Sequence, residues 1–411
     1  MVIAEQKLLK WGLVLNAIYV LLFFLIRPDG INIVKISITT LLLFSVLIIC
    51  SLSIKNIYRL KEIPQFSRFL FYMLLIWGGI TIVRSFSFSI QDWVTNFGNV
   101  YMGLAWIAPL AMVLGLKLEN WNIVFKVIFF VFKLMIPVFG ISLLFNTSYL
   151  QWAWLLRSVN LILLLGLSRI SLIKKGIVLV IIGIYILVAI SVKQRMDLLF
   201  LSLTMGFLIM DKLIGIKIRR VFLKYIISFF ILVLILVFTV GYEFVSNTIS
   251  SIIDFQDSRT FLFYELFNEL NLIEKWIGRG SLGTYYSHFF EHTKWYTINI
   301  LKKPWWGDSS VRITIEVGYL QMILKGGMLL FLLNTLIYIN AIYLALFKSS
   351  NKFVKRLGYY ILVITLLSLV SLRPTFAPTF IFLWMAIGTV LPKKYRLMKD
   401  DEIYSVVKQL R

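Results

Sequence analysis

Long apolar segments recur along the whole chain, and their length limits what it can fold into. A helix needs about 20 apolar residues to cross roughly 30 Å of hydrocarbon, and inside lipid each backbone N–H and C=O must be bonded within the segment. Runs of this kind occur about twelve times. We therefore expect an all-α polytopic integral membrane protein, with spans at residues 9–26, 34–53, 69–84, 97–116, 123–145, 152–170, 176–192, 197–211, 221–242, 316–347, 357–372 and 379–391.

The composition excludes several other classes of protein. The chain is 60% hydrophobic and only 15% charged, whereas a soluble domain is about half apolar and about a quarter charged. This excludes a soluble enzyme, a disordered chain and a disulfide scaffold. The single cysteine, Cys50, has no intrachain partner, and two histidines without accompanying thiols do not make a structural zinc site. We expect no metal and no cofactor.

The basic residues predict the orientation of the spans. The net charge of +23 would suggest a nucleic-acid partner on a soluble protein, but in a membrane protein Lys and Arg concentrate in cytoplasmic loops. With the N-terminus inside, 24 of the 42 basic residues lie in predicted cytoplasmic segments. Both termini are therefore predicted to be cytoplasmic, and no nucleic-acid partner is expected.

One outer loop is much longer than the others and divides the chain into four parts. Nine spans are expected in residues 1–242, a large periplasmic loop in 243–315, three spans in 316–391 and a basic tail in 392–411. Loops of such length are usually functional or disordered, but this one is too rich in aromatic residues for a solvated linker. A helix start at Asp257-Ser258 indicates a helical cap on the outer membrane face.

Three charged residues inside predicted spans are candidates for function because charge in hydrocarbon is costly. Lys133 lies in the fifth span, Arg157 lies in the sixth, and Lys325 lies in the tenth beside Gly326-Gly327. Each is a candidate for contacting phosphate or handling a proton in a cavity.

Further cations lie at predicted outer helix ends. Lys193 and Arg195 follow the seventh span, and Asp197 begins the eighth. Arginine binds phosphate oxygens with a planar fork and lysine adds a point charge, so the pair would suit a pyrophosphate at the membrane surface. The alternative is an ordinary salt bridge with Asp197. Arg259 opens the predicted loop helix and could point at the same place.

Arg279 lies in the glycine-rich stretch Gly278-Arg279-Gly280-Ser281-Leu282-Gly283. Glycines let backbone approach a ligand closely, and successive N–H groups can form an anion nest. A nucleotide-type phosphate loop is not indicated, because no Lys-Ser/Thr follows and no strand precedes the stretch.

Three residues are candidates for acid–base catalysis. Glu316 lies four residues after Arg312, so the two can pair on one helical face. Alternatively, Glu316 could act as general base on a sugar hydroxyl if it is partly buried, because desolvation disfavours its charged form. His288 and His292 are also four apart and are the usual type of acid–base group near neutral pH. The alternative for both is an exposed loop position.

Together these residues resemble the O-antigen polymerase and ligase family, which includes the Wzy-type polysaccharide polymerases. The resemblance rests on Arg259 at the start of a loop helix, a Trp-Ile-Gly-Arg-Gly-x-x-Gly turn from Trp276, and Glu316-Val317-Gly318-Tyr319-Leu320-Gln321 followed by Gly326-Gly327. It also covers about a dozen spans and one large outer loop near the C-terminus.

The resemblance implies a metal-independent, membrane-embedded glycosyltransferase of GT-C-like architecture in the bacterial inner membrane. Its donor would be an undecaprenyl-diphosphate-linked oligosaccharide, and a hydroxyl of a second glycan would attack with inversion. Arg195 and Arg259 would hold the diphosphate, with Arg279 and Arg312 as further candidates. A chain-length regulator and a flippase would be partners, besides membrane lipids.

Two alternatives stay open. Ligases of the family share a histidine just before the span that holds the glycines, where this chain reads Arg312-Ile313-Thr314-Ile315-Glu316, which favours a polymerase over a ligase-type transferase. A flippase or other transporter would also have about twelve spans, but transporters usually show related halves, and here only one half carries a long loop.

Overall fold

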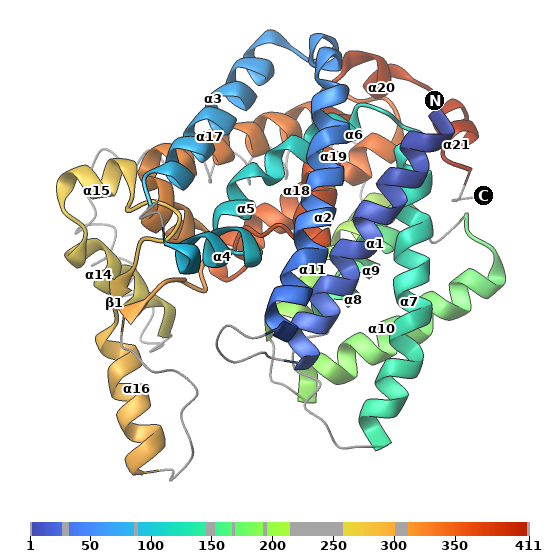
Figure 1. The fold of residues 1–411 in the computed structure, drawn as a ribbon. Helices are drawn as coiled ribbons and strands as arrows, with labels where there is room; N and C mark the ends of the chain where they lie inside the picture. Colours follow the sequence, from blue (N-terminus) through green and yellow to red (C-terminus); the bar gives the residue numbers. More distant parts are fainter. Residues whose placement is uncertain are drawn as a thin grey trace.

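The computed structural model describes residues 2–26, 33–85, 89–144, 153–166, 169–191, 195–213, 258–300 and 311–408. These residues form a bundle of helices with one very small sheet (Figure 1). The N-terminal helices are α1 Val2–Ile26, α2 Ile33–Lys55, η1 Ile57–Glu62, α3 Gln65–Val83, α4 Ile90–Gly98, α5 Gly103–Ile107, η2 Ala108–Ala111, α6 Met112–Gly115, α7 Asn120–Leu144, α8 Ala153–Leu156, α9 Val159–Leu165, α10 Leu172–Ser191 and α11 Arg195–Leu213. The later elements are α14 Ser258–Glu269, α15 Leu272–Ile277, β1 Tyr285–Tyr286, α16 His288–Asn299, β2 Val311–Arg312, α17 Gly318–Phe347, α18 Lys352–Val370, α19 Pro378–Val390, α20 Lys393–Leu397 and α21 Asp400–Val406.

Seven helices in the described ranges are long and apolar enough to cross a membrane. They are Ala4–Phe23, Ile36–Lys55, Gln65–Val83, Asn120–Ile141, Leu172–Ile190, Gly318–Phe347 and Lys352–Val370. An eighth span is possible if Ile90–Gly98 and Gly103–Gly115, which meet at a bend of 50°, cross together. These helices coincide with predicted spans, so the chain is an all-α polytopic membrane protein, as its sequence indicates.

The other predicted spans are not among these membrane-spanning helices. The segments predicted at 152–170 and 379–391 contain the shorter apolar helices Trp154–Leu165 and Pro378–Val390, and the segment at 197–211 lies in α11. The segment at 221–242 lies outside the described residues. The total of about twelve spans therefore stays a prediction.

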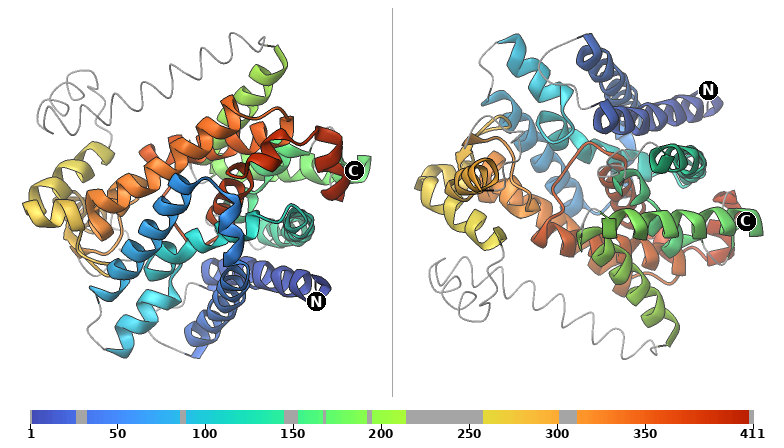
Figure 2. Two further views of the ribbon diagram at one scale, coloured as in Figure 1. Left: turned by 90° about the horizontal axis from the view of Figure 1, so that it is seen from above. Right: turned by 90° about the horizontal axis from the view of Figure 1, so that it is seen from below.

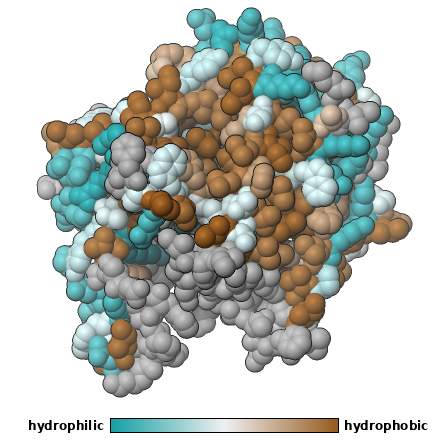
Figure 3. All heavy atoms as spheres, in the orientation of Figure 1, coloured by the Kyte–Doolittle hydropathy of each residue, from teal (hydrophilic) through white to brown (hydrophobic). Residues whose placement is uncertain are grey.

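The surface of the bundle suits contact with lipid. Phe44 and Leu47 on α2 and Phe69 on α3 are each more than half exposed. Figure 3 shows hydrophobic side chains across the middle of this face, with hydrophilic ones concentrated toward its edges. Exposed apolar surface of this extent is unusual on a soluble monomer and is normal where lipid chains cover it.

Segments predicted to be cytoplasmic meet at one end of the bundle. Glu5 binds both Lys55 and Lys117, at 2.8 Å and 2.7 Å, and Lys394 of the tail binds Glu62 at 2.5 Å. Both chain ends lie on the same side of the bundle in Figure 1. The predicted grouping of these segments is therefore confirmed, while the side of the membrane on which they lie stays a prediction.

The long loop forms a helical cap in its described part. The predicted helix start is confirmed, because α14 begins at Ser258, whereas the strand pair was not predicted. β1 and β2 pair antiparallel, with Tyr285 opposite Arg312. Leu262 and Leu266 of α14 are buried in one apolar cluster with Leu320 and Leu324 of α17. Figure 2 shows the cap against the first part of α17.

Two glycines let the backbones of the cap and α17 touch. Gly278 and Gly327 share the same backbone angles, φ 69° and ψ −174°, a region that only glycine adopts readily. A Cβ on Gly278 would lie 2.4 Å from the carbonyl carbon of Lys325, and one on Gly327 would lie 2.1 Å from the carbonyl oxygen of Trp276. The break predicted at Gly326-Gly327 is therefore confirmed as a kink, and close packing explains it.

Alanine at either glycine should destabilise the protein. Gly278→Ala and Gly327→Ala each combine a strained backbone with a clash against main-chain atoms, and we expect each to cost about 2–4 kcal/mol. Gly183→Ala is the matched control, because nothing lies within 4 Å of its added Cβ. Thermal unfolding in detergent should show a lower midpoint for the first two variants alone. Equal midpoints for all three would contradict this packing.

Candidate functional site

Arg157 is part of a buried polar cluster. It lies between α8 and α9, where its carbonyl accepts a hydrogen bond from Asn160 Nδ2 at 3.1 Å. Its Nε donates to Oδ1 of Asp197 at 2.6 Å, and the hydroxyl of Tyr185 donates to the same oxygen at 2.9 Å. Asp197 is only 1% exposed. The structure therefore pairs Asp197 with Arg157, and the alternative pairing with Arg195 is not seen.

A second arginine lies beside this cluster and was not singled out in the sequence. Arg373, in the connection between α18 and α19, places its guanidinium carbon 3.7 Å from the ring centroid of Tyr101. Tyr101 in turn meets Trp154 edge to face at 5.1 Å, and Arg157 lies 5.2 Å from the Trp154 ring. Two aromatic rings therefore link the two guanidinium groups, at a contact distance typical of cation–π pairs.

The position of Arg373 depends on contacts distant in sequence. The backbone N–H of Phe376 donates to the carbonyl of Val100 at 2.8 Å, which ties the α18–α19 connection to the break between α4 and α5. In the sequence, Arg373 is one basic residue in a short loop that is predicted to lie on the outer side. Its position among the other predicted outer cations is the only sequence signal that indicates a functional role.

Arg312 and Glu316 pair with each other, which confirms one of the two expectations for them. Nη2 of Arg312 lies 2.9 Å from Oε1 of Glu316, and the Glu316 side chain is 57% exposed. The burial that would favour Glu316 as a general base is therefore absent. Glu316, Arg157 and Arg373 all lie within electrostatic range of the buried Tyr101 hydroxyl.

We call Arg157, Arg312 and Arg373, together with Asp197 and Glu316, the arginine cluster. It lies where α10, α18 and the cap end, opposite to the chain termini. Arg195 is the first residue of α11, two residues before Asp197, and it is exposed. The side chains of Lys193 and Arg259 lie outside the described residues, so their predicted contacts with diphosphate stay predictions.

Arg279 has a different environment. Its Nε and Nη2 donate to the carboxylate of Glu274 at 3.0 and 3.1 Å, and its Nη1 donates to Oε1 of Glu269 at 2.5 Å. Carbonyl oxygens of Thr284 and Glu269 accept two further bonds, at 2.8 and 3.2 Å. All five N–H donors of a guanidinium are therefore used inside the cap. This geometry gives Arg279 a structural role and leaves no donor for phosphate.

The expected anion nest around Arg279 is not formed either. The N–H groups of Arg279 and Gly280 donate to carbonyl oxygens of α17, and that of Ser281 donates to Thr81, each at 2.8 Å. The N–H of Leu282 donates to Ser85 Oγ at 3.0 Å, and Gly283 closes a turn onto Gly280. The glycine-rich stretch therefore anchors the cap, and its donors are occupied.

The remaining candidates lie apart from the arginine cluster. His288 and His292 begin α16 and are exposed, in agreement with the alternative for them. The described residues contain no group of three His, Cys, Asp or Glu side chains that could hold a metal. Lys325 is fully buried and donates to the carbonyl of Gly283 at 2.8 Å. Tyr319 packs between Phe263 and Phe331.

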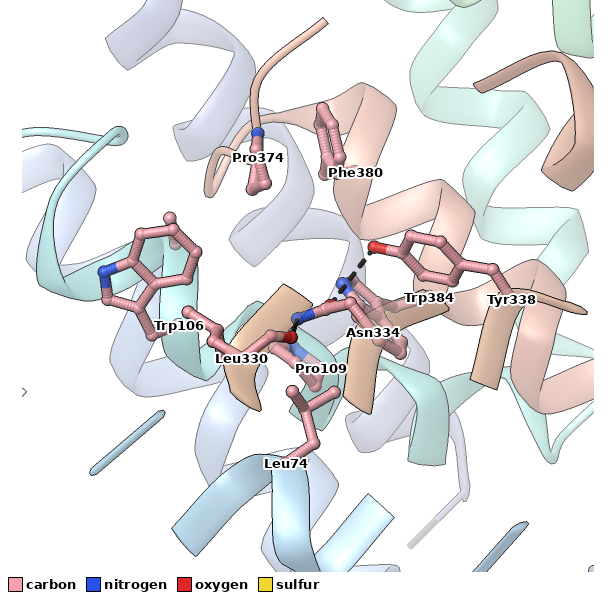
Figure 4. Close-up of a pocket in the computed structure, with 10 residues that line it drawn as sticks. Leu74, Trp106, Pro109, Leu330, Asn334, Tyr338, Pro374, Phe380 and Trp384 are labelled. Carbon is pink, nitrogen blue, oxygen red and sulfur yellow. Dashed lines mark hydrogen bonds between the residues drawn. The ribbon is translucent and has the colours of Figure 1, made fainter. Parts of the chain in front are cut away.

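A small cavity lies among α3, α5, α17 and α19 (Figure 4). Its wall is mostly apolar, and Pro374 at its rim directly follows Arg373. The polar groups in the wall largely bond to one another, since Asn334 Nδ2 donates to Leu330 O at 2.8 Å and the Tyr338 hydroxyl donates to Asn334 at 3.3 Å. The wall of the cavity therefore includes the residue that follows Arg373 in the chain, and no member of the arginine cluster lines it.

Comparison with protein-family models, curated proteins and solved structures finds no match for this chain.

Replacement of Arg279 should affect stability and leave anion binding unchanged. Because Arg279→Gln leaves two cap carboxylates without their partner, we expect a loss of about 1–3 kcal/mol, measured as a lower midpoint of thermal unfolding. Hydrogen bonding to Arg279 lowers the pKa of Glu274 below its ordinary 4.5. The stabilisation is therefore complete above pH 4.5 and is lost as the pH falls further. Lost affinity for pyrophosphate with an unchanged midpoint would contradict this assignment.

Proposed function

We propose that this protein is a polymerase of bacterial surface polysaccharide. It joins undecaprenyl-diphosphate-linked oligosaccharide repeat units at the outer face of the inner membrane, with undecaprenyl diphosphate as the leaving group. The arginine cluster is the observation that carries the proposal. The twelve-span, GT-C-like topology and the cytoplasmic termini belong to the same proposal.

The chemistry of the cluster suits a diphosphate. Arginine offers a planar fork that binds phosphate oxygens in pairs. Three arginines face only two carboxylates in the cluster, so its formal charge is positive. Arg373 contacts Tyr101 through both the ring and the hydroxyl, and it has no carboxylate partner among the described residues.

The surroundings of the cluster suit a lipid-linked donor. Pro374, which directly follows Arg373 in the chain, lines the small apolar cavity of Figure 4, so the protein next to the proposed headgroup site is apolar. The cluster is also at the end of the bundle opposite to the chain termini. With the predicted orientation, that end faces the compartment in which surface glycans are assembled.

The transfer step follows from this arrangement. The oxygen of an acceptor hydroxyl bonds to the anomeric carbon, the bond from that carbon to the diphosphate oxygen breaks, and the hydroxyl proton passes to a base. Negative charge grows on the departing diphosphate, and preorganised cations stabilise it most in the transition state. Arg157, Arg312 and Arg373 supply that stabilisation, with Arg195 and Arg259 as predicted additions.

One observation favours transport as a second candidate function. The 50° bend between α4 and α5 puts an interrupted span directly beside Arg373, and transporters often bind substrates at broken helices. A flippase would bind the same diphosphate and release the glycan unchanged. A ligase-type transferase would instead move a finished glycan to a different acceptor.

Loss of the cluster arginines should abolish polymer synthesis. Arg157→Ala and Arg373→Ala should each lower the rate at least about 100-fold, because each removes a donor that stabilises the leaving group. Arg195→Ala and Arg259→Ala should also stop chain extension. The measurement is gel analysis of surface polysaccharide in a deletion strain complemented with each variant.

Arg68→Ala is the matched control, because Arg68 lies on α3 at the opposite end of the bundle. It should give normal long-chain ladders. Normal ladders from both Arg157→Ala and Arg373→Ala, at wild-type protein levels, would refute the role of the cluster.

Purified protein should make polymer from lipid-diphosphate-linked repeat units in the presence of a chelator, because the cluster supplies the cations that a metal ion would otherwise provide. Chain length on gels is the measurement. A strict requirement for a divalent ion would contradict the proposal. Repeat units that cross vesicles without any glycan growth would support the transporter instead.

A further inference from the structure

Asp197 is buried, and only one of its two carboxylate oxygens accepts hydrogen bonds from the described residues. Its side chain is 1% exposed, and both described hydrogen bonds reach the same oxygen, Oδ1. The other oxygen, Oδ2, is buried without a hydrogen-bond partner among the described residues. A buried carboxylate is costly unless it is paired, so its presence needs an explanation beyond packing.

Arg157 pairs with Asp197 through a single nitrogen, Nε, of its guanidinium. Arg–carboxylate pairs are frequently bidentate, with two parallel N–H···O bonds. Here only Nε of Arg157 is bonded, at 2.6 Å, and the side chain is 12% exposed. Its two terminal nitrogens have no hydrogen bond to the described residues and are not among the buried unpaired atoms. The two terminal nitrogens of this mostly buried side chain therefore keep donors that no described residue accepts.

Two further contacts fix the orientation of this side chain. The hydroxyl of Tyr185 holds Oδ1 of Asp197 at 2.9 Å, and Tyr185 itself is 1% exposed. The ring of Trp154 covers the guanidinium at 5.2 Å. Asp197, Tyr185 and Trp154 belong to three different helices, so they fix the guanidinium from three directions.

We propose that Asp197, held by Tyr185, is a positioning residue that fixes Arg157 by its Nε so that the two terminal nitrogens bind a diphosphate. This inference rests on the proposed function, because the diphosphate is that of the lipid-linked donor. It adds that the affinity of the arginine cluster for diphosphate depends on a buried carboxylate that does not touch the ligand.

The test is the affinity of the purified full-length protein for inorganic pyrophosphate in detergent, measured by calorimetry together with the midpoint of thermal unfolding. Asp197→Asn keeps the shape of the side chain and removes its charge. We expect affinity to fall about 10–100-fold, the range for outer-shell partners of metal ligands. Tyr185→Phe removes one hydroxyl from the same arrangement and should give a smaller loss.

Arg157→Lys separates positioning from simple ion pairing. A lysine can bind Asp197 or reach the ligand but cannot do both, so its affinity for pyrophosphate should be as low as that of Arg157→Ala. A merely structural ion pair would be restored by lysine. In addition, Asp197→Asn combined with Arg157→Ala should bind no more weakly than Arg157→Ala alone, because Asp197 acts through Arg157.

The outcomes distinguish this inference from the proposed function. If Asp197→Asn binds pyrophosphate like the wild type at an unchanged unfolding midpoint, the positioning role is refuted even if polymer is made. If Asp197→Asn does not fold, additive losses in the Tyr185→Phe and Arg157→Ala double variant refute the role. Failure of the wild type to bind pyrophosphate refutes it as well. If binding depends on Asp197 but no polymer forms, positioning holds and the polymerase proposal fails.

Discussion

Hydrocarbon offers no partner to a backbone N–H or to a charge, and this constraint organises the whole molecule. It makes each long apolar segment a helix, and it restricts interrupted backbone to places lined by protein. The break between α4 and α5 is covered by the α18–α19 connection through Phe376 and Val100. The kink at Gly327 is covered by the cap at Trp276. Arg157 packs within the bundle, where its Nε donates a hydrogen bond to Asp197 and its guanidinium lies over the ring of Trp154.

The cap and the arginine cluster differ in how their polar groups are used. The glycine-rich stretch, Arg279 and Lys325 join the cap to α17 through backbone contact and hydrogen bonds. Arg279 and the N–H groups of the glycine-rich stretch leave no free donor for a ligand. Arg157 and Arg373 are held differently: Nε of Arg157 donates to Asp197 while its terminal nitrogens donate to no described residue, and Arg373 contacts Tyr101. We infer that the first set holds the structure in place and that the second binds the substrate.

The sequence predicted most of the helices because membrane spans are local in sequence, and the charge pattern predicted which loops lie together. It also predicted the helix start at Ser258 and the break at Gly327. It did not reveal Arg373, whose role depends on Tyr101, more than 270 residues away in the chain. It predicted a phosphate contact for Arg279 that the structure does not support. A glycine-flanked arginine has the same sequence pattern whether its partners are phosphates or Glu269 and Glu274. Contacts between distant segments decide such cases, and a single sequence does not display them.

The central claim is that the arginine cluster binds the diphosphate of a lipid-linked glycan. The most direct measurement is an experimental structure of the purified protein with undecaprenyl diphosphate bound. The account predicts both phosphates within hydrogen-bond distance of Arg157 and Arg373, with the first part of the hydrocarbon chain near Pro374. Phosphates bound at the end of the bundle that holds the chain termini, with the cluster empty, would contradict it.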